Sequence, residues 1–372
     1  MNLSPKLVAA WQHLLGLCNV KNSEAVLILV GEETNALHLA AARYAVSQLS
    51  AKLLTVELGE APTGRLAGES TAWYGPTALS GNQPALEAMK CVDLVIDLMG
   101  MYRGAEQEQI LAAGTRIILV KEPPEVFMRL LPRAGDKARV QAAERMLARD
   151  CRMVVRSDAG TDLAVAFAQY PCLVQYGFAD EAGRWDHCPS AFIARWPDEG
   201  SSNGTVVLDC GDTILPFKDY VRTPIRLDIR DGYVRNIEGG FDAKYLREYM
   251  ASFNDPEAYA VSHLGWGLHD RAHWTMLGMY DKRQSNAMDS RSYEGNFMFS
   301  TGPNSEAGGS RHTACHLDIP ISSCSVWVDE EQVVDRGVVM PEDQRGASAS
   351  LTDHFHQPDQ IKIAPKGTYA KP

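Results

Sequence analysis

Apolar and polar residues alternate along the first part of the chain as they do when buried strands are separated by helices. Four runs are almost entirely apolar over the length of one strand, as is typical of parallel-sheet strands buried on both faces. Helical patterns lie between them, including an Ala-rich stretch that opens near Asn35. The four runs are Ala25–Val30, Leu53–Leu58, Val92–Leu98 and Thr115–Val120. The rhythm predicts a Rossmann-like parallel sheet covered by helices.

The pattern changes after an amphipathic helix that we expect to end near Asp150. Over Thr205–Ile237, short alternating runs are separated by Gly and Asp turns, and CSVWVDEEQVVDRG near the end of the chain predicts a hairpin. Asp242–Met250 is the best helical pattern in this part. A chain of 372 residues typically forms two domains. We therefore predict an N-terminal α/β domain over residues 1–150 and a β-rich α+β domain over residues 151–372.

Charge and cysteine content narrow the class of protein. There are 36 Lys and Arg residues against 47 Asp and Glu, which gives a net charge of −11. That balance argues against binding to nucleic acid or to acidic membranes, which need a concentrated positive face. No apolar run approaches the roughly 20 residues of a membrane span. The eight cysteines are scattered without a CxxC pair, so we expect buried thiols in a reducing cytoplasm.

Two common kinds of site have no support in the sequence. No GxGxxG follows the first apolar run, and Gly31-Glu32-Glu33 places two carboxylates where a dinucleotide phosphate would bind. The one GxSxG match, GSSNG at residues 200–204, follows the polar Pro-Asp-Glu stretch and not an apolar strand, so a serine-hydrolase hypothesis has no support either.

The histidines are the most informative residues. Five of the ten fall between positions 263 and 316, and the sharpest pattern among them is His316-Leu317-Asp318. In an extended strand, residues i and i+2 point to the same face, so the imidazole and the carboxylate would project side by side as two metal ligands. We expect Pro320 to stop or kink this strand. One more histidine would complete a two-His, one-carboxylate set with open positions on iron.

His263 is the best candidate for the third ligand, because VSHLGWGL is an apolar, Gly-rich setting that can hold an imidazole rigidly. His269 and His273 lie in the more polar HDRAHW, which we expect at the surface. A single histidine in an apolar setting is more often a hydrogen-bonded core residue, and that alternative stays open for His263.

Two further stretches carry candidate chemistry. GRWDHCP, which we expect to be a loop, places His187 beside Asp186 and Arg184, either as an acid or base or in a structural turn with an Asp–Arg pair. The stretch from Arg291 to Ser300 offers a guanidinium and a hydroxyl to a polar aromatic substrate, or is simply a strand with its loop.

Four motifs in this order resemble the 2,5-dihydroxypyridine 5,6-dioxygenases over nearly the whole chain. They are GTDL (160–163), GRWDHCPS (183–190), SHLGWGL (262–268) and HLDIPI (316–321). The family shares its fold with metallopeptidases of the thermophilic leucyl-aminopeptidase type. The resemblance implies a mononuclear Fe(II) site made by His263, His316 and Asp318. It also implies opening of a hydroxypyridine ring by O2 between carbons 5 and 6, which gives N-formylmaleamate.

The resemblance also implies a set of substrate contacts. His187 would take a proton from the ring hydroxyl, Arg291 would stabilise negative charge, and Ser300 would orient the ring. The family carries an aromatic-His pair where this chain has Tyr102-Arg103, and a Glu where it has Gln175. We expect these three residues to bind substrate in a site between the domains.

Arg103 has an alternative role as a solvated partner of Glu106. We also expect the chain to form a homo-oligomer.

The main competing hypothesis is a metallo-aminopeptidase. Those enzymes hold two metals with extra carboxylates from a Thr-Glu-Glu and an Ala-Glu-Leu stretch, where this chain reads Trp185-Asp186-His187 and Ser262-His263-Leu264. The carboxylates that would bridge a second metal are therefore missing. A third hypothesis, a non-catalytic protein that kept the fold, predicts no bound metal.

Overall fold

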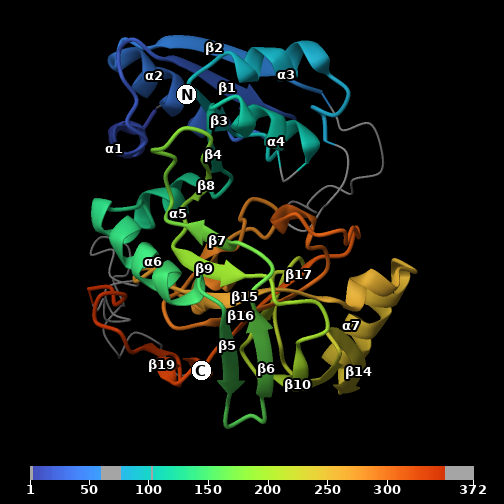
Figure 1. Cartoon of the computed structure of the whole chain (residues 1–372). Helices are drawn as coiled ribbons and strands as arrows, with labels where there is room; N and C mark the ends of the chain where they lie inside the picture. Colours follow the sequence, from blue (N-terminus) through green and yellow to red (C-terminus); the bar gives the residue numbers. More distant parts are fainter. Residues whose placement is uncertain (1–2, 60–76, 102–103, 348–372) are drawn as a thin grey trace, which may run out of the picture.

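The computed structural model describes residues 3–59, 77–101 and 104–347 of the chain. Figure 1 shows a parallel sheet with its helices in the upper part of the molecule and antiparallel sheets in the lower part. This arrangement confirms the predicted fold class of a Rossmann-like sheet followed by a β-rich α+β part.

The upper sheet has five parallel strands in the order β2-β1-β3-β4-β8. All four predicted strands are present, and β1, β3 and β4 are almost wholly buried as expected. The second strand lies at the sheet edge and is largely exposed, because it has a neighbour on one side only. The strands are β1 (Ala25–Val30), β2 (Lys52–Glu57), β3 (Leu94–Asp97), β4 (Arg116–Val120) and β8 (Trp185–Cys188).

Five of the described helices, α1 to α5, accompany this sheet, whereas α6 packs on two strands of the lower part, residues 172–175 and 192–195. Aromatic rings join three of the five. Trp11 in α1, His38 in α2 and Phe127 in α5 pack against one another with ring centroids 5.1 to 5.6 Å apart. The Asn35 side chain caps α2 by accepting from the backbone nitrogens of Leu37 and His38, which confirms the predicted helix start. The helices are α1 (Pro5–Leu17), α2 (Ala36–Gln48), α3 (Gln83–Lys90), α4 (Ala105–Ala112), α5 (Pro124–Arg129) and α6 (Ala134–Leu147).

The chain returns to the upper sheet after the predicted domain boundary. β8 pairs with β4 in parallel, with Leu119 opposite His187 and Val120 opposite Cys188. The fifth strand of the first sheet is thus supplied by residues well beyond Asp150. The division at that residue stays a prediction.

The lower part contains a large antiparallel sheet in the order β14-β13-β10-β6-β5-β18-β19-β20. The predicted C-terminal hairpin is confirmed as the pair β18 and β19. The predicted helix of this part is also present as α7 (Phe241–Ser252), which packs on β13 and β14. The strands are β5 (Cys151–Arg156), β6 (Asp162–Phe167), β10 (Asn203–Leu208), β13 (Ile225–Arg230), β14 (Tyr233–Gly239), β18 (Ser325–Val328), β19 (Glu331–Asp335) and β20 (Val338–Val339).

A second antiparallel sheet, in the order β17-β16-β15-β9-β7, shares its hydrophobic core with the first. Its strands are β7 (Cys172–Gln175), β9 (Phe192–Arg195), β15 (Val261–Gly267), β16 (Phe297–Thr301) and β17 (Leu317–Ile321). Pro320 lies inside β17 and does not end it, so the expected stop is wrong, whereas the alternative of a kink stays a prediction. The strand tolerates proline because it is the edge strand of this sheet.

Short elements complete the lower part: β11 (Thr213–Ile214), β12 (Asp219–Tyr220), α8 (Met288–Arg291) and three 3₁₀ turns, η1 (Pro256–Tyr259), η2 (Trp274–Met279) and η3 (Ser305–Ala307). The eight cysteines are free thiols. None of the helices in the described part of the chain is long and apolar enough to cross a membrane.

Candidate metal centre

The HxD pattern forms the geometry that the sequence predicts. His316 directly precedes β17 and Asp318 is the second residue of that strand, and both side chains are buried. On its outer edge, the backbone of Asp318 exchanges hydrogen bonds with Leu215 at 2.9 and 3.2 Å. The strand is therefore fixed on both sides where it presents these two residues.

His263 joins them because of an irregularity in the neighbouring strands. In the register of β15 against β16, Val261 lies opposite Thr301 and Leu264 opposite Phe299, so two residues of β15 face Ser300. A bulge of this kind re-aims a side chain. Ser300 itself lies directly opposite Asp318 on β17. The bulge thus directs the His263 imidazole toward the His316 and Asp318 side chains.

The three side chains converge on one point. Asp318 Oδ1 lies 3.4 Å from His263 Nε2 and 3.2 Å from His316 Nε2, and the three candidate ligand atoms all lie within 4.8 Å of one another. Ligands bound at about 2.1 Å and at right angles around one metal are about 3 Å apart. The spacing therefore fits a single shared cation.

The tautomer of His263 follows from its contact with Ser300. The Ser300 hydroxyl donates to the backbone oxygen of His263 at 2.6 Å, so its oxygen must accept from His263 Nδ1–H. The Nε2 lone pair of His263 then faces the Asp318 carboxylate. Two lone pairs at this distance repel each other unless a cation lies between them, and a metal ion satisfies both.

Asp318 is ionised at neutral pH. Burial alone would raise the pKa of this carboxyl, but the Arg291 guanidinium holds the pKa well below its usual range. Arg291 Nε lies 3.0 Å from Asp318 Oδ2, while Oδ1 faces the histidines. One oxygen of the carboxylate therefore pairs with Arg291, and the other faces the position that a metal ion would occupy. Two imidazole nitrogens and one carboxylate oxygen fit a divalent metal such as iron.

We expected His187 to lie in a loop, but it lies in β8 of the parallel sheet. The expectation was wrong because the pairing partner, β4, is far away in the sequence. Arg184 and Asp186 do form the predicted ion pair, at 2.6 Å, and Asp186 also accepts from the backbone nitrogens of Tyr176 and Gly177. The pair anchors the start of β8. His187 lies near its carboxyl end, the edge where ligands bind in parallel sheets.

Two residues near His187 were missed by the sequence reasoning. Asn286 Nδ2 lies 3.0 Å from His187 Nε2. Glu122, two residues after β4, is buried and accepts hydrogen bonds from Ser285, Asn286 and Met288. The one available signal was the position of Glu122, a carboxylate two residues after a buried parallel strand.

The structure gives no substrate contact for the predicted substrate residues that it describes. Gln175, at the end of β7, is buried, and its Oε1 accepts from the Ser190 hydroxyl at 2.9 Å. Tyr102 and Arg103 lie outside the described residues. A substrate contact of Ser300 also stays a prediction, since the contacts described for its hydroxyl are to His263.

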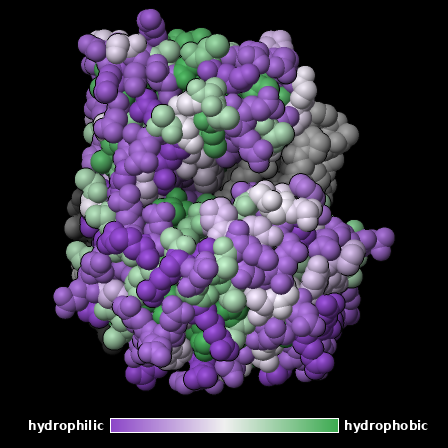
Figure 2. Space-filling view, viewed as in Figure 1, coloured by the Kyte–Doolittle hydropathy of each residue, from purple (hydrophilic) through white to green (hydrophobic). Residues whose placement is uncertain are grey.

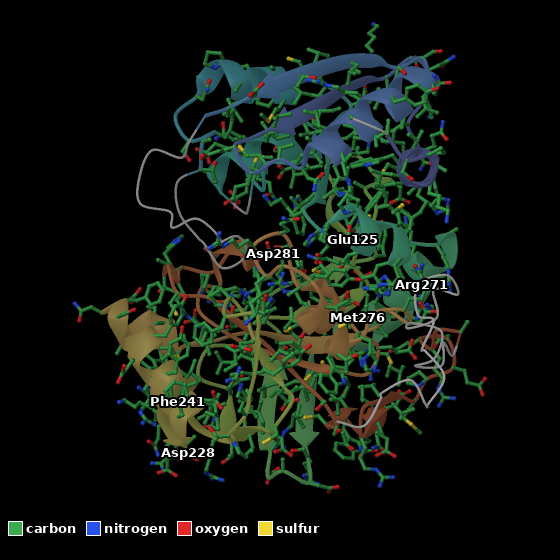
Figure 3. The ribbon with its side chains drawn as sticks, turned by 180° about the vertical axis from the view of Figure 1, so that it is seen from behind. Glu125, Asp228, Phe241, Arg271, Met276 and Asp281 are labelled. Carbon is green, nitrogen blue, oxygen red and sulfur yellow. The ribbon has the colours of Figure 1, made fainter. Side chains whose placement is uncertain are left out.

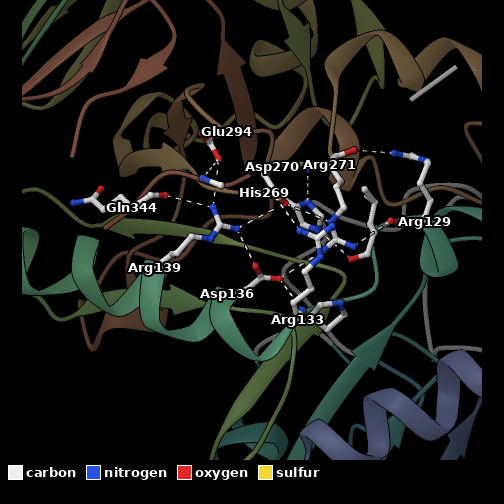
Figure 4. A network of polar contacts seen from close by, with 12 residues as sticks. Arg129, Arg133, Asp136, Arg139, His269, Asp270, Arg271, Glu294 and Gln344 are labelled. Atoms are coloured by element: carbon white, nitrogen blue, oxygen red, sulfur yellow. Dashed lines mark hydrogen bonds and ion pairs between the residues drawn. The ribbon is translucent and has the colours of Figure 1, made fainter. Parts of the chain in front are cut away.

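His269 is buried rather than at the surface, which corrects our expectation for HDRAHW. Its Nε2 donates to the Leu130 oxygen at 3.0 Å, and Nδ1 accepts from the backbone nitrogen of Arg271. It belongs to a network of ionic groups that joins α6 to the 269–271 segment (Figure 4). Asp270 and Arg271 pair with each other and with α6, so these charged residues are half-buried and cover His269.

The space between the upper and lower parts contains a cavity of about 500 Å³. Its lining includes the start of α2, Glu122, Ser285 and Asn286. Figure 2 shows the surface hollowed between the two parts. Seen from behind in Figure 3, Asp281 and Glu125 lie where the two parts meet, whereas Phe241 and Asp228 lie at the far end of the lower part.

Fold and site together define a two-part α/β protein with a buried two-histidine, one-carboxylate centre, the ligand set of non-haem iron oxygenases. The chain belongs to the 2,5-dihydroxypyridine 5,6-dioxygenase family, whose model matches residues 6–341. This confirms the resemblance stated from the sequence motifs.

Known relatives agree with this assignment. A 2,5-dihydroxypyridine 5,6-dioxygenase of Pseudomonas putida is 48% identical over 343 residues, which is 91% of this chain and 98% of that protein. The solved structure of 2,5-dihydroxypyridine dioxygenase from P. putida KT2440 superposes with a TM-score of 0.89 at 48% identity, covering 91% of this chain and 98% of that one. Wild-type AmpT from Thermus thermophilus shares the fold at 12% identity, with a TM-score of 0.58 over 90% of this chain and 99% of that one.

Proposed function

We propose that this protein is an Fe(II)-dependent dioxygenase that opens 2,5-dihydroxypyridine, or a close hydroxypyridine, with O2. The observation that carries the proposal is the convergence of His263, His316 and Asp318 on one point in a member of this family. The P. putida relative, named for this reaction, supports the substrate class. Addition of both oxygen atoms of O2 to the ring gives N-formylmaleamate, so the reaction balances without an external reductant.

The metal would be held by Nε2 of His263, Nε2 of His316 and Oδ1 of Asp318. Bound there, Fe(II) would supply the redox chemistry that activates O2 toward an aromatic ring. Ser300 orients the His263 ring through Nδ1, and Arg291 holds Asp318 through Oδ2. The two residues keep the ligands in place before any substrate enters.

The remaining groups act on the substrate. His187 takes the proton of a ring hydroxyl, because a neutral imidazole is a base at physiological pH. Arg291 contacts Asp318 through Nε, so the other donors of its guanidinium can stabilise negative charge on the substrate oxygens. Tyr102, Arg103 and Gln175 complete the substrate contacts in this proposal, with Arg103 reading an extra polar group on the ring.

The aminopeptidase alternative is not favoured by the ligand set. A two-metal site needs bridging carboxylates. In the part of the chain that the structure describes, the cluster contains one carboxylate, Asp318. The likeness to AmpT, at 12% identity, concerns the fold alone.

The test is metal loading under anaerobic conditions followed by oxygen uptake. We expect one Fe(II) per chain and one O2 consumed per 2,5-dihydroxypyridine. Alanine at position 263, 316 or 318 should abolish metal binding and turnover with the far-UV circular dichroism unchanged, whereas His312→Ala, at an exposed histidine nearby, should behave as wild type. A requirement for two equivalents of zinc, manganese or cobalt would instead support the peptidase alternative.

We also propose that the protein works in the cytoplasm as a homo-oligomer. Free thiols at all eight cysteines agree with a reducing compartment. Light scattering of the full chain measures the oligomeric state, and a monomeric mass at micromolar concentration would contradict this part of the proposal.

A further inference from the structure

The contact between Asn286 and His187 joins two segments that are 99 residues apart in the sequence. Both side chains are buried, at 1% and 2% exposure. The amide nitrogen of Asn286 donates to His187 Nε2 at 3.0 Å. A neutral imidazole has one N–H, so this contact places the proton of His187 on Nδ1 and the lone pair on Nε2.

Asn286 is itself held by the Glu122 carboxylate. Oε2 of Glu122 accepts from the backbone nitrogen of Asn286 at 3.0 Å and from the Ser285 hydroxyl at 2.9 Å, while Oε1 accepts from the backbone nitrogen of Met288 at 2.7 Å. Charge-assisted hydrogen bonds of this kind are about twice as strong as neutral ones. They fix the turn that precedes α8.

The turn holds a conformation that its sequence disfavours. Ala287 has φ +61°, in the left-handed region that residues with a Cβ rarely adopt. Such a conformation persists only where the surroundings over-determine it. The three hydrogen bonds to Glu122 supply that constraint, and α8 directly continues to Arg291 and its contact with Asp318.

We propose that Asn286, held in place by Glu122, is a positioning residue that sets the orientation and the proton of His187. The proposal rests on the proposed function, in which His187 takes a proton from the substrate. A primary amide suits this task because it can serve both states of the base. Nδ2 donates to the Nε2 lone pair of the neutral imidazole until the substrate hydroxyl displaces the amide and transfers its proton to Nε2. After a 180° turn of the amide, Oδ1 can accept from the Nε2–H of the imidazolium.

Substitutions at position 286 separate this role from simple packing. Asn286→Leu keeps the branching and the number of side-chain heavy atoms but has neither donor nor acceptor, so kcat for 2,5-dihydroxypyridine should fall about tenfold, the value of one hydrogen bond, with KM within about twofold and the bound metal retained. Asn286→Gln keeps the amide and should recover part of the loss. Glu122→Gln should also lower kcat, because the NH2 group of the glutamine amide cannot accept a hydrogen bond from the backbone N–H groups.

Matched controls lie close by. Gln284→Leu changes an exposed side chain of the same segment, and Glu125→Gln removes an exposed carboxylate three residues from Glu122. Both should leave kcat and KM unchanged. In the double variant His187→Gln/Asn286→Leu, turnover should be no lower than in His187→Gln alone, because the amide acts through the imidazole.

A measurement independent of activity is the ¹⁵N spectrum of the histidine rings in the full chain loaded with diamagnetic Zn²⁺. The His187 signals are identified by their loss in His187→Gln. We expect the wild type to show the proton on Nδ1, and Asn286→Leu to show a mixture of both tautomers.

An unchanged tautomer in Asn286→Leu, or additive losses in the double variant, would overturn the proposal. If wild type fails to open hydroxypyridines, or His187→Gln is fully active, the proposed function fails instead, and the spectrum still decides whether Asn286 positions His187.

Discussion

The Ser300 hydroxyl and the His263 residue exchange two hydrogen bonds, one to the backbone oxygen and one from the ring nitrogen Nδ1. One small side chain on β16 therefore fixes both the rotation and the tautomer of a candidate ligand on β15. The same residue lies opposite Asp318 in the register of β16 and β17. Ser300 is thus at the centre of the three strands that carry the metal site.

Loss of this hydroxyl should weaken metal binding. In Ser300→Ala the His263 ring loses the acceptor for Nδ1–H, so we expect metal affinity to fall by roughly ten- to a hundredfold, the usual effect of removing an outer partner of a metal ligand. Competition with a chelator measures this change. Ser262→Ala is the matched control, since it removes another buried hydroxyl, bonded to the Pro303 oxygen at 2.6 Å, from the adjacent residue. Equal affinities of the two variants would contradict the prediction.

A side chain at Gly302 should displace His316. Gly302 has φ +123°, and a Cβ there would overlap the backbone oxygen of Cys315 and lie 3.1 Å from His316 Cα and 3.3 Å from His316 Nδ1. Gly302→Ala should therefore lower both metal affinity and stability, the latter by roughly 1–3 kcal/mol. Gly308→Ala separates the two effects, because Gly308 also has a positive φ but a Cβ there meets nothing within 4 Å. Chemical unfolding and metal titration of both variants measure the difference, and full metal affinity in Gly302→Ala would rule out the crowding of His316.

Arg139 should be important for stability. It contacts Asp136 at 2.9 Å, Glu294 at 3.3 Å and Asp270 at 3.8 Å (Figure 4). Arg139→Met would remove the cation that pairs with Glu294 and one of the two that Asp136 and Asp270 share, leaving them Arg271, at a cost of roughly 3 kcal/mol. In Arg145→Met, on the same helix, the lost pair with Asp343 is 68% and 65% exposed, and exposed pairs contribute little. Urea unfolding compares the two, and similar midpoints would show that the network contributes little.

Two buried histidines should make the protein less stable in mild acid. Burial lowers the pKa of His38 and of His269 to about 4. Above the unfolded pKa of about 6.5, both are neutral in either state and have no effect. As the pH falls from about 6.5 toward 4, the unfolded chain binds protons that the folded chain does not, so the free energy of unfolding falls by roughly 1.4 kcal/mol per pH unit for each histidine. Below about pH 4 both histidines are protonated in the folded and the unfolded chain, so their effect on the free energy of unfolding no longer changes with pH.

The measurement is urea unfolding of the metal-free chain between pH 7 and pH 5. His38→Gln should be less stable at pH 7, because it loses the contact from Trp11 Nε1 at 3.1 Å, but its stability should depend less steeply on pH. Equal slopes for wild type and variant would refute the assignment of this pH dependence to His38.

Local pattern was sufficient for much of the fold and for part of the site. The apolar runs of β1, β3 and β4 predict buried strands because both faces of such a strand are covered, which favours apolar side chains on both. Asn35 marks the start of α2 because its side chain accepts from the first free backbone N–H groups. His316 and Asp318 share a face because the strand period is two. These features depend on neighbours in the sequence.

Other features were decided by contacts between distant segments. Trp185–Cys188 becomes a strand only because β4, some 65 residues earlier, offers it an edge, and Pro320 is tolerated because the final sheet leaves β17 at its own edge. His269 is buried because the charges beside it pair with α6, and Asn286 reaches His187 because Glu122 holds its turn. Such pairings depend on which surfaces meet after the chain has folded, and no local periodicity encodes them.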